Sequence, residues 1–297
     1  MMKNKLRIVF LGTPEFAVES LDAIIKSGHE VIAVVTATDK PAGRGHKLLP
    51  SAVKQYALEH DLEVLQPEKL RDEAFIERLR ELNADLNVVI AFRMLPREVW
   101  DMPRLGTMNL HASLLPRYRG AAPINHAVMN GDSETGVTTF LLKHEIDTGD
   151  MLRQARIEIA PDENVGSVHD RLMHLGAQVV VDSINDLANG TVTPIPQNDE
   201  EATPAPKIFK NTCQLRREMT TEQAFNHIRG LSPYPAAWTD ELCNGLNIKV
   251  LEAKKTSEKI PGHLYMDFAD GFLELIRIQP AGKRPMAATD FLRGLRQ

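Results

Sequence analysis

Residues 6–26 read LRIVFLGTPEFAVESLDAIIK, a short apolar run followed by a stretch whose apolar side chains recur at helical spacing. The run at residues 6–11 contains β-branched residues and predicts a strand. From Phe16 to Lys26 the apolar residues fall three or four positions apart, which predicts an amphipathic helix. No small-residue cleavage site follows the apolar run, so we interpret it as a first strand and not as a signal peptide.

The same alternation continues through the first third of the chain. Further strands are predicted at residues 31–35, 62–65, 86–91 and 107–110, and further helices at residues 52–58 and 73–82. Strands that alternate with helices predict an α/β fold with a doubly wound, mostly parallel sheet and right-handed crossovers. Ligands of such sheets bind beyond the carboxyl ends of the strands, which here means the loops after residues 11, 36, 91 and 110.

The pattern changes in the second half of the chain. Strands are expected at residues 137–142 and 151–159, and a long helix at residues 168–187. Residues 190–211 are rich in Pro, Thr, Asp and Glu and are interpreted as a linker. One helix (221–229) and short strands (247–252, 264–268 and 272–279) follow, which makes a small β-barrel plausible. We therefore predict two domains, at residues 1–189 and 212–297, joined by a linker at residues 190–211.

Composition excludes several classes of protein. The chain has 297 residues, of which 43% are hydrophobic and 25% charged, as in ordinary globular proteins. No apolar run approaches the roughly 18 residues of a membrane span. Two cysteines, Cys213 and Cys243, make neither a disulfide framework nor a metal-binding spacing, so we expect a protein of the reducing cytoplasm without a metal.

Charge is unevenly distributed along the chain. The whole chain holds 35 Lys+Arg and 40 Asp+Glu, whereas residues 203–297 hold 14 Lys+Arg and 10 Asp+Glu. A basic tail on an acidic body suits a modular protein that binds a polyanion. Chance scatter of solvated charges is the alternative interpretation.

A polar cluster stands at the end of the strand predicted at residues 107–110. Asn109 and His111 are two residues apart, so in a strand their side chains share one face. An amide and an imidazole side by side suit acyl transfer, because both can donate a hydrogen bond to an oxygen that gains negative charge. The alternative is a strand-end pair whose polar atoms are satisfied by the backbone.

A second cluster, Glu145-Ile-Asp-Thr-Gly-Asp150, follows a later strand. A carboxylate such as that of Asp147, placed near an imidazole, fixes the tautomer of the ring and stabilises its cation. A solvated aspartate in a surface turn is the alternative.

A third cluster, Asp39-Lys-Pro-Ala-Gly-Arg-Gly-His-Lys47, follows the second strand and is basic and glycine-rich. It lacks the spacing of a Walker phosphate loop, and residues 12–14 lack the dinucleotide-binding glycine fingerprint. Lysine and arginine in such a loop could hold a phosphate backbone. An ordinary surface loop is the alternative.

Several of these stretches together resemble the methionyl-tRNA formyltransferase family. The matching stretches are FLGTPEFAV (10–18), DKPAGRG (39–45), HASLLPRYRGAAPI (111–124), DTGDM (147–151), IRGLSPYP (228–235) and QPAGK (279–283). They follow the family's order along nearly the whole chain. The chain departs from the family pattern at residues 91–96 and 142–146, and it is short between Lys259 and Leu264.

The resemblance implies a Rossmann-like formyltransferase domain and a C-terminal domain similar to an oligonucleotide-binding fold. It implies transfer of a formyl group from 10-formyltetrahydrofolate to the methionine amino group of charged initiator tRNA, by a cytoplasmic monomer that needs no metal or membrane. The residues that it assigns are Asn109, His111 and Asp147 for catalysis, Ser113, Leu114, Leu115 and Pro116 for folate, and Lys40, Arg44 and Lys47 for tRNA.

Two rival functions stay open. A formyltransferase for a small amine would use the same chemistry but would not need the chain from Pro204 onward. A non-catalytic protein that binds tRNA or folate would keep the fold but would not need all of Asn109, His111 and Asp147.

Overall fold

The computed structural model describes residues 4–42 and 47–295. The chain divides into two compact units. Unit 1 comprises Met1–Arg119, Gly136–Arg156 and Asp170–Thr203, and unit 2 comprises Gly120–Thr135, Ile157–His169 and Pro204–Gln297. The predicted domain boundaries around residues 190 and 211 stay a prediction.

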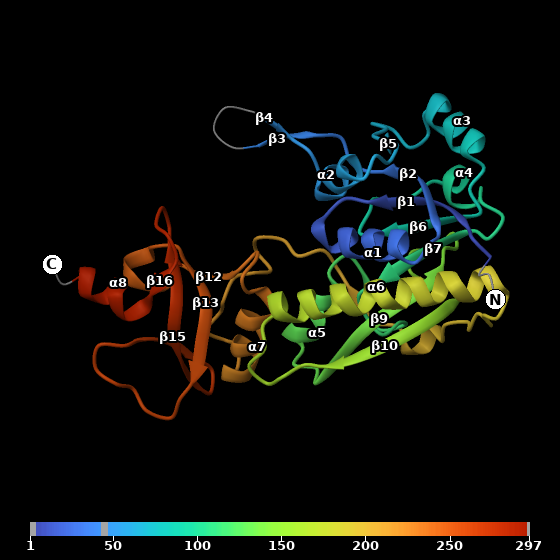
Figure 1. Ribbon diagram of the computed structural model, residues 1–297. Coiled ribbons are helices and arrows are strands. Elements are labelled where there is room, and N and C mark those ends of the chain that lie inside the picture. The colour runs from blue at the N-terminus through green and yellow to red at the C-terminus, as the bar shows by residue number, and fades with distance from the viewer. Residues whose placement is uncertain (1–3, 43–46, 296–297) are drawn as a thin grey trace. The chain divides into compact units, whose positions relative to one another are not determined.

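Unit 1 is built on a 7-stranded sheet whose strand order is β10-β9-β7-β6-β1-β2-β5 (Figure 1). These strands are β1 (Arg7–Gly12), β2 (Glu30–Val35), β5 (Val64–Leu65), β6 (Leu86–Ile90), β7 (Thr107–His111), β9 (Glu134–Leu141) and β10 (Met151–Glu158). The five strands from β7 to β5 run parallel, and β9 pairs antiparallel with β7. The predicted α/β sheet is thus confirmed. The chain order reverses between β1 and β6, so the carboxyl ends of β1, β6 and β7 border the switch point at which such sheets bind ligands.

Helices cover both faces of this sheet. They are α1 (Glu15–Lys26), α2 (Ala52–Glu59), α3 (Glu73–Leu82), α4 (Arg97–Trp100) and α6 (Val165–Asn189). Helix α6 lies against β7, where Gly176 approaches Leu110, and beside α1, where His174 donates to Glu19 over 3.0 Å (Figure 1). In the described residues, no helix has both the length and the apolar character needed to cross a membrane.

The core under α3 buries one face of strands β1 and β6, which accounts for their apolar residues on that face. Phe75 and Leu79 of α3 pack with Val9 of β1 and Val89 of β6 in one cluster of buried side chains. Each such side chain contributes about 1.5–3 kcal/mol when it leaves water. Asp72 caps α3 by accepting a hydrogen bond from the backbone nitrogen of Phe75 over 3.1 Å. The core fixes β6 and thereby the position of its neighbour β7.

A short antiparallel pair follows β2. It consists of β3 (Lys40–Ala42) and β4 (Lys47–Leu49). The sequence predicts a loop over this basic stretch, whereas in the structure residues 40–42 and 47–49 form paired strands.

Unit 2 holds the predicted C-terminal β domain. Its helices are α5 (Pro123–Met129), α7 (Thr221–Leu231) and α8 (Ala288–Leu295), and its strands are β12 (Ala237–Thr239), β13 (Ile248–Lys255), β14 (Leu264–Phe268), β15 (Gly271–Pro280) and β16 (Met286–Ala287). The sheet order is β12-β13-β15-β14, with β16 paired to β15. Among the described residues β14 has no pairing to β12, so the sheet is a half-barrel and not a closed barrel.

The stretch predicted as a linker, residues 190–211, contains some regular structure. A short 3-10 helix (Asp199–Glu201) and β11 (Pro204–Ala205) lie in it. Composition had suggested an irregular segment because polar residues and prolines dominate there.

Candidate active site

Strand β7 presents Asn109 and His111 on one face at its carboxyl end. Asn109 is in register with Val89 of β6 and Phe140 of β9, and His111 is in register with Thr138 of β9. His111 has no partner in the β6 register, because β6 ends at Ile90. Its side chain therefore stands where the sheet opens, as the alternation of side chains along a strand predicts.

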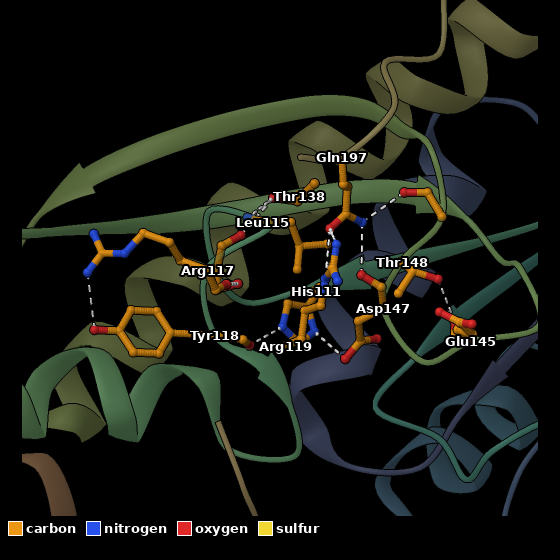
Figure 2. Close-up of polar contacts among 12 residues, drawn as sticks. His111, Leu115, Arg117, Tyr118, Arg119, Thr138, Glu145, Asp147, Thr148 and Gln197 are labelled. Carbon is orange, nitrogen blue, oxygen red and sulfur yellow. Dashed lines mark hydrogen bonds and ion pairs between the residues drawn. The ribbon is translucent and has the colours of Figure 1, made fainter. Parts of the chain in front are cut away.

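Two protein groups face the nitrogens of His111 (Figure 2). Nε2 lies 2.8 Å from the carbonyl oxygen of Tyr118, and Nδ1 lies 3.8 Å from Oδ2 of Asp147. A carbonyl oxygen only accepts, so Nε2 carries its hydrogen in this arrangement. Nδ1 then carries a hydrogen only when the ring is protonated, and the Asp147 carboxylate is the group that faces this nitrogen.

Asp147 lies in the turn between β9 and β10, and its side chain is 12% exposed. Its backbone is left-handed, with φ of 55°. Gly149 sits against the backbone of β9, where a β-carbon would lie 1.6 Å from the carbonyl oxygen of Leu141, so only glycine fits. Thr148 closes the turn by donating to the carbonyl oxygen of Glu145 over 3.1 Å. The tight turn brings Asp147 to His111, although 36 residues of sequence separate them.

The Asn109 side chain is half-buried and forms no hydrogen bond with another described residue. Its amide is therefore available to a bound molecule. An amide beside an imidazole is a donor set suited to an oxygen that becomes an anion.

The four residues predicted to contact folate differ in their accessibility. Ser113 and Leu115 are buried, and Leu114 and Pro116 are half-buried. Thr138 ties this segment down: its hydroxyl donates to the carbonyl oxygen of Ser113 over 2.7 Å and accepts from the backbone nitrogen of Leu115 over 3.1 Å. Side-chain contact with a ligand is thus open to Leu114 and Pro116, whereas Ser113 and Leu115 shape the segment from within.

The three residues predicted to contact tRNA belong to the β3–β4 pair and its connection. Lys40 is exposed at the start of β3, and Lys47 starts β4. Arg44 lies outside the described residues. Just before β3, the side chain of Asp39 accepts from Nζ of Lys54 over 2.7 Å and from Nε2 of Gln66 over 2.9 Å. The hydrogen bond from Lys54, followed by that from Gln66, lowers the pKa of Asp39.

Sequence reasoning missed three residues beside this site: Tyr118, Arg119 and Gln197. Tyr118 acts through its backbone carbonyl, which no side-chain pattern reveals. Gln197 lies in the predicted linker, and its side chain donates to backbone carbonyls of the Asp147 turn. No spacing in the sequence signals this contact, because it joins segments about 50 residues apart.

The described residues contain no group of three or more His, Cys, Asp or Glu side chains that could hold a metal ion. The polar groups gathered at the end of β7 are an amide, an imidazole and a carboxylate.

Comparisons of the sequence with known proteins show the family to which the chain belongs. A family model described as formyl transferase matches residues 6–184, and one described as formyl transferase, C-terminal domain, matches residues 207–296. A methionyl-tRNA formyltransferase of Bacteroides fragilis is 52% identical, over 99% of this chain and 96% of its own length. The chain belongs to the methionyl-tRNA formyltransferase family. The resemblance noted in the sequence is thereby confirmed.

A methionyl-tRNA formyltransferase of Flavobacterium johnsoniae is 49% identical over 98% of this chain and 97% of its own length. The alignment with the Bacteroides fragilis methionyl-tRNA formyltransferase runs over 313 residues, more than the 297 of this chain. That relative therefore carries residues that have no counterpart in this chain.

Solved structures agree on the fold. The sugar 3N-formyltransferase WlaRD, crystallised with dTDP and 5-N-formyl-THF, has a TM-score of 0.68 at 17% identity and covers 94% of this chain and 99% of its own. HypX from Aquifex aeolicus in complex with tetrahydrofolic acid has a TM-score of 0.66 at 17% identity, over 97% of this chain and 47% of its own. WlaRD and HypX thus share the fold seen here.

Proposed function

We propose that the chain transfers the formyl group of 10-formyltetrahydrofolate to the α-amino group of methionine on charged initiator tRNA, as a cytoplasmic monomer. The observation that carries this proposal is the His111–Asp147 pair, 3.8 Å apart beside the free amide of Asn109 at the end of β7. Membership of the family supports the same reaction. Asn109, His111 and Asp147 are the proposed catalytic residues.

The reaction needs a neutral amine, because a protonated amine has no electron pair with which to attack. A free α-amino group titrates at about pH 7.7–8.0, so a useful fraction is neutral at physiological pH. The amine nitrogen attacks the formyl carbon, and the carbonyl electrons move to the oxygen. Collapse of this tetrahedral intermediate forms the new amide and breaks the bond to the folate nitrogen, which receives the proton that the amine loses.

The proposed roles follow from where the polar atoms lie. The Asn109 amide and the Nδ1 hydrogen of the His111 imidazolium donate to the oxygen of the intermediate. Since 3.8 Å is longer than a hydrogen bond, Asp147 stabilises the charge of the ring without consuming its Nδ1 hydrogen. A water molecule held by Asp147 is the proposed relay that carries the amine proton to the folate nitrogen.

The donor and acceptor are proposed to meet at this edge of the sheet. Ser113, Leu114, Leu115 and Pro116 are the proposed folate segment, with contact through the accessible Leu114 and Pro116. Lys40, Arg44 and Lys47 are the proposed tRNA contacts, with Arg44 as the main one. Lysine and arginine bind phosphates through charge, and arginine can do so with two hydrogen bonds.

A formylation assay with three acceptors tests the substrate. Charged initiator tRNA should be formylated much faster than charged elongator tRNA, and free methionine should not react. Equal rates for free methionine and charged initiator tRNA would show that the acceptor is a small amine. No formylation of any acceptor would leave only a binding function.

Two substitutions test the chemistry. Asn109→Ala and His111→Ala should each lower the single-turnover rate by about a hundredfold or more, as the loss of one oxyanion donor does elsewhere. Folate affinity should change little. His174→Ala is the matched control, because that histidine is 63% exposed on α6, where it pairs with Glu19. Wild-type rates for both variants would remove the proposed mechanism.

A further inference from the structure

The turn that carries Asp147 is held from behind by a side chain that the proposed mechanism does not use. Nε2 of Gln197 lies 2.8 Å from the carbonyl oxygen of Asp147 and 2.8 Å from the carbonyl oxygen of Gly149. The two hydrogens of one amide group thus reach two carbonyls of the same turn (Figure 2). This contact fixes the backbone on both sides of Thr148.

Such support matters because Asp147 has a left-handed backbone, with φ of 55°. This conformation is less favourable for a residue with a β-carbon than for glycine, although aspartate tolerates it better than most, so contacts that hold the turn help to keep it. If the turn relaxed, the direction of the Asp147 side chain would change with its backbone. The carboxylate would then no longer be aimed at Nδ1 of His111.

Arg119 determines which way the Gln197 amide points. Nε and Nη2 of Arg119 donate to Oε1 of Gln197 over 3.1 Å and 2.8 Å. A guanidinium has only donors, so it holds the amide oxygen and leaves the amide hydrogens directed at the turn. Asp199 accepts from Nη2 over 2.6 Å, but its side chain is 80% exposed and contributes little by itself.

The same short segment also holds the other side of His111. Tyr118, the residue before Arg119, supplies the carbonyl that accepts from Nε2 of His111. This segment is anchored in turn by Thr203, which accepts from the backbone nitrogen of Tyr118 over 2.9 Å and from that of Arg119 over 2.8 Å. One piece of structure therefore fixes both His111 and, through Gln197, the turn of Asp147.

We propose that Gln197, oriented by Arg119, is a positioning residue that sets the Asp147 carboxylate relative to His111. The inference rests on the proposed catalytic role of Asp147. Gln197 does not face the reacting atoms, since its two amide hydrogens and its oxygen all meet protein groups. Its effect should therefore appear in the chemical step and not in substrate binding.

Gln197→Met tests this, because methionine keeps the length of the side chain and removes both donors. We expect kcat to fall by about tenfold to a hundredfold, as small displacements of catalytic groups do. The KM values for 10-formyltetrahydrofolate and for charged initiator tRNA should stay within about twofold. Gln178→Met is the matched control, since Gln178 is exposed on α6 and hydrogen-bonds Asp182 one turn away on the same helix.

A double-mutant cycle with Asp147→Asn separates a positioning role from a general structural one. If Gln197 acts through Asp147, then Gln197→Met should cause no further loss of kcat in the Asp147→Asn background. An equal fold-loss in both backgrounds would overturn the inference, because Gln197 would then act independently of the carboxylate. Arg119→Lys provides a second variant in case Gln197→Met fails to fold, and it should lower kcat in the same way.

The outcomes distinguish this inference from the proposed function. Wild-type kcat for Gln197→Met, with a slow Asp147→Asn enzyme, would overturn the positioning role and leave the proposed mechanism intact. Wild-type kcat for Asp147→Asn would remove the catalytic role of Asp147 and the inference with it.

Discussion

Single residues show how much of the site depends on backbone groups. His111 is held by a carbonyl oxygen, and Asp147 is held through two carbonyl oxygens that Gln197 bonds. A backbone carbonyl stays in place whichever side chain its residue carries, so substitution of that residue does not remove it. Sequence change at this site is therefore expected to act through the residues that contact the backbone.

Another single residue, His227 on α7, couples the stability of unit 2 to pH. Its side chain is 6% exposed, and burial lowers its pKa, although the nearby backbone of Cys213 and Thr212 acts in the opposite direction. The unfolded state therefore binds a proton more readily than the folded state. This contribution to stability is complete above about pH 6.5, the usual pKa of histidine. It is lost as the pH falls from there towards the lower pKa that His227 has in the folded state.

The free energy of unfolding of the wild type should therefore decrease below about pH 6.5, by at most about 1.4 kcal/mol per pH unit for this one proton. Denaturant unfolding between pH 7.5 and pH 5 measures it. His227→Asn should give a shallower dependence, whereas His174→Asn, at an exposed site, should keep the wild-type slope. Identical slopes for His227→Asn and the wild type would contradict the assignment.

Among the elements, the β3–β4 pair depends on a clamp at its base. The Asp39 carboxylate joins Lys54 of α2 and Gln66, and Gln66 also donates to the carbonyl oxygen of Ala37 over 2.7 Å. Ser51 connects the two sides again, because it caps α2 and hydrogen-bonds the hydroxyl of Thr36 over 2.7 Å. Helix α2 and the chain after β5 thus determine the direction in which β3 leaves the sheet.

Lys54→Met should loosen this clamp and raise the KM for charged initiator tRNA by several-fold, with the KM for 10-formyltetrahydrofolate unchanged. The physical reason is that a bound tRNA would have to order the strand pair itself, at a cost in conformational entropy. Lys26→Met is the control, since Lys26 pairs with Asp22 on α1 and is 74% exposed. Equal tRNA KM values for the Lys54→Met enzyme and the wild type would show that the clamp does not serve tRNA binding.

The whole molecule carries a net charge of −5, yet its proposed partner is a polyanion. Binding must therefore rely on local clusters of basic residues and not on the net charge. Residues 203–297, with 14 Lys+Arg against 10 Asp+Glu, and the basic β3–β4 pair are two regions where basic residues outnumber acidic ones. Contacts between such clusters and phosphates release counterions, which makes affinity depend on salt.

The logarithm of the affinity for charged initiator tRNA should fall linearly with the logarithm of salt concentration. Arg44→Ala and Lys40→Ala should each reduce the slope by about 1, as the loss of one phosphate contact does. Fluorescence anisotropy over a range of salt concentrations measures this slope. Arg80→Ala should leave it unchanged, because Arg80 pairs with Glu77 on α3. Affinity that is independent of salt would contradict the polyanion proposal.

Much of the fold could be predicted because its signals are local. The apolar run at residues 6–11 and the helical spacing after Phe16 arise from the immediate neighbours of each residue, and they became β1 and α1. The placement of two polar side chains on one face of a strand is equally local. Asn109 and His111 were predicted to share a face because they are two residues apart. Weakly periodic stretches were missed, including α5, α8 and the β3–β4 pair, because short elements depend on the packing around them.

The sequence by itself determined the alternation of strands and helices, the family, and the amide and imidazole at the end of one strand. Only the tertiary structure decided that Asp147 faces His111, that Gln197 holds the turn of Asp147, and that Arg119 orients Gln197. These contacts join segments that are tens of residues apart, and they run through backbone carbonyls that every residue possesses. A pattern of side chains cannot encode such contacts, because folding alone brings these carbonyls within hydrogen-bond distance.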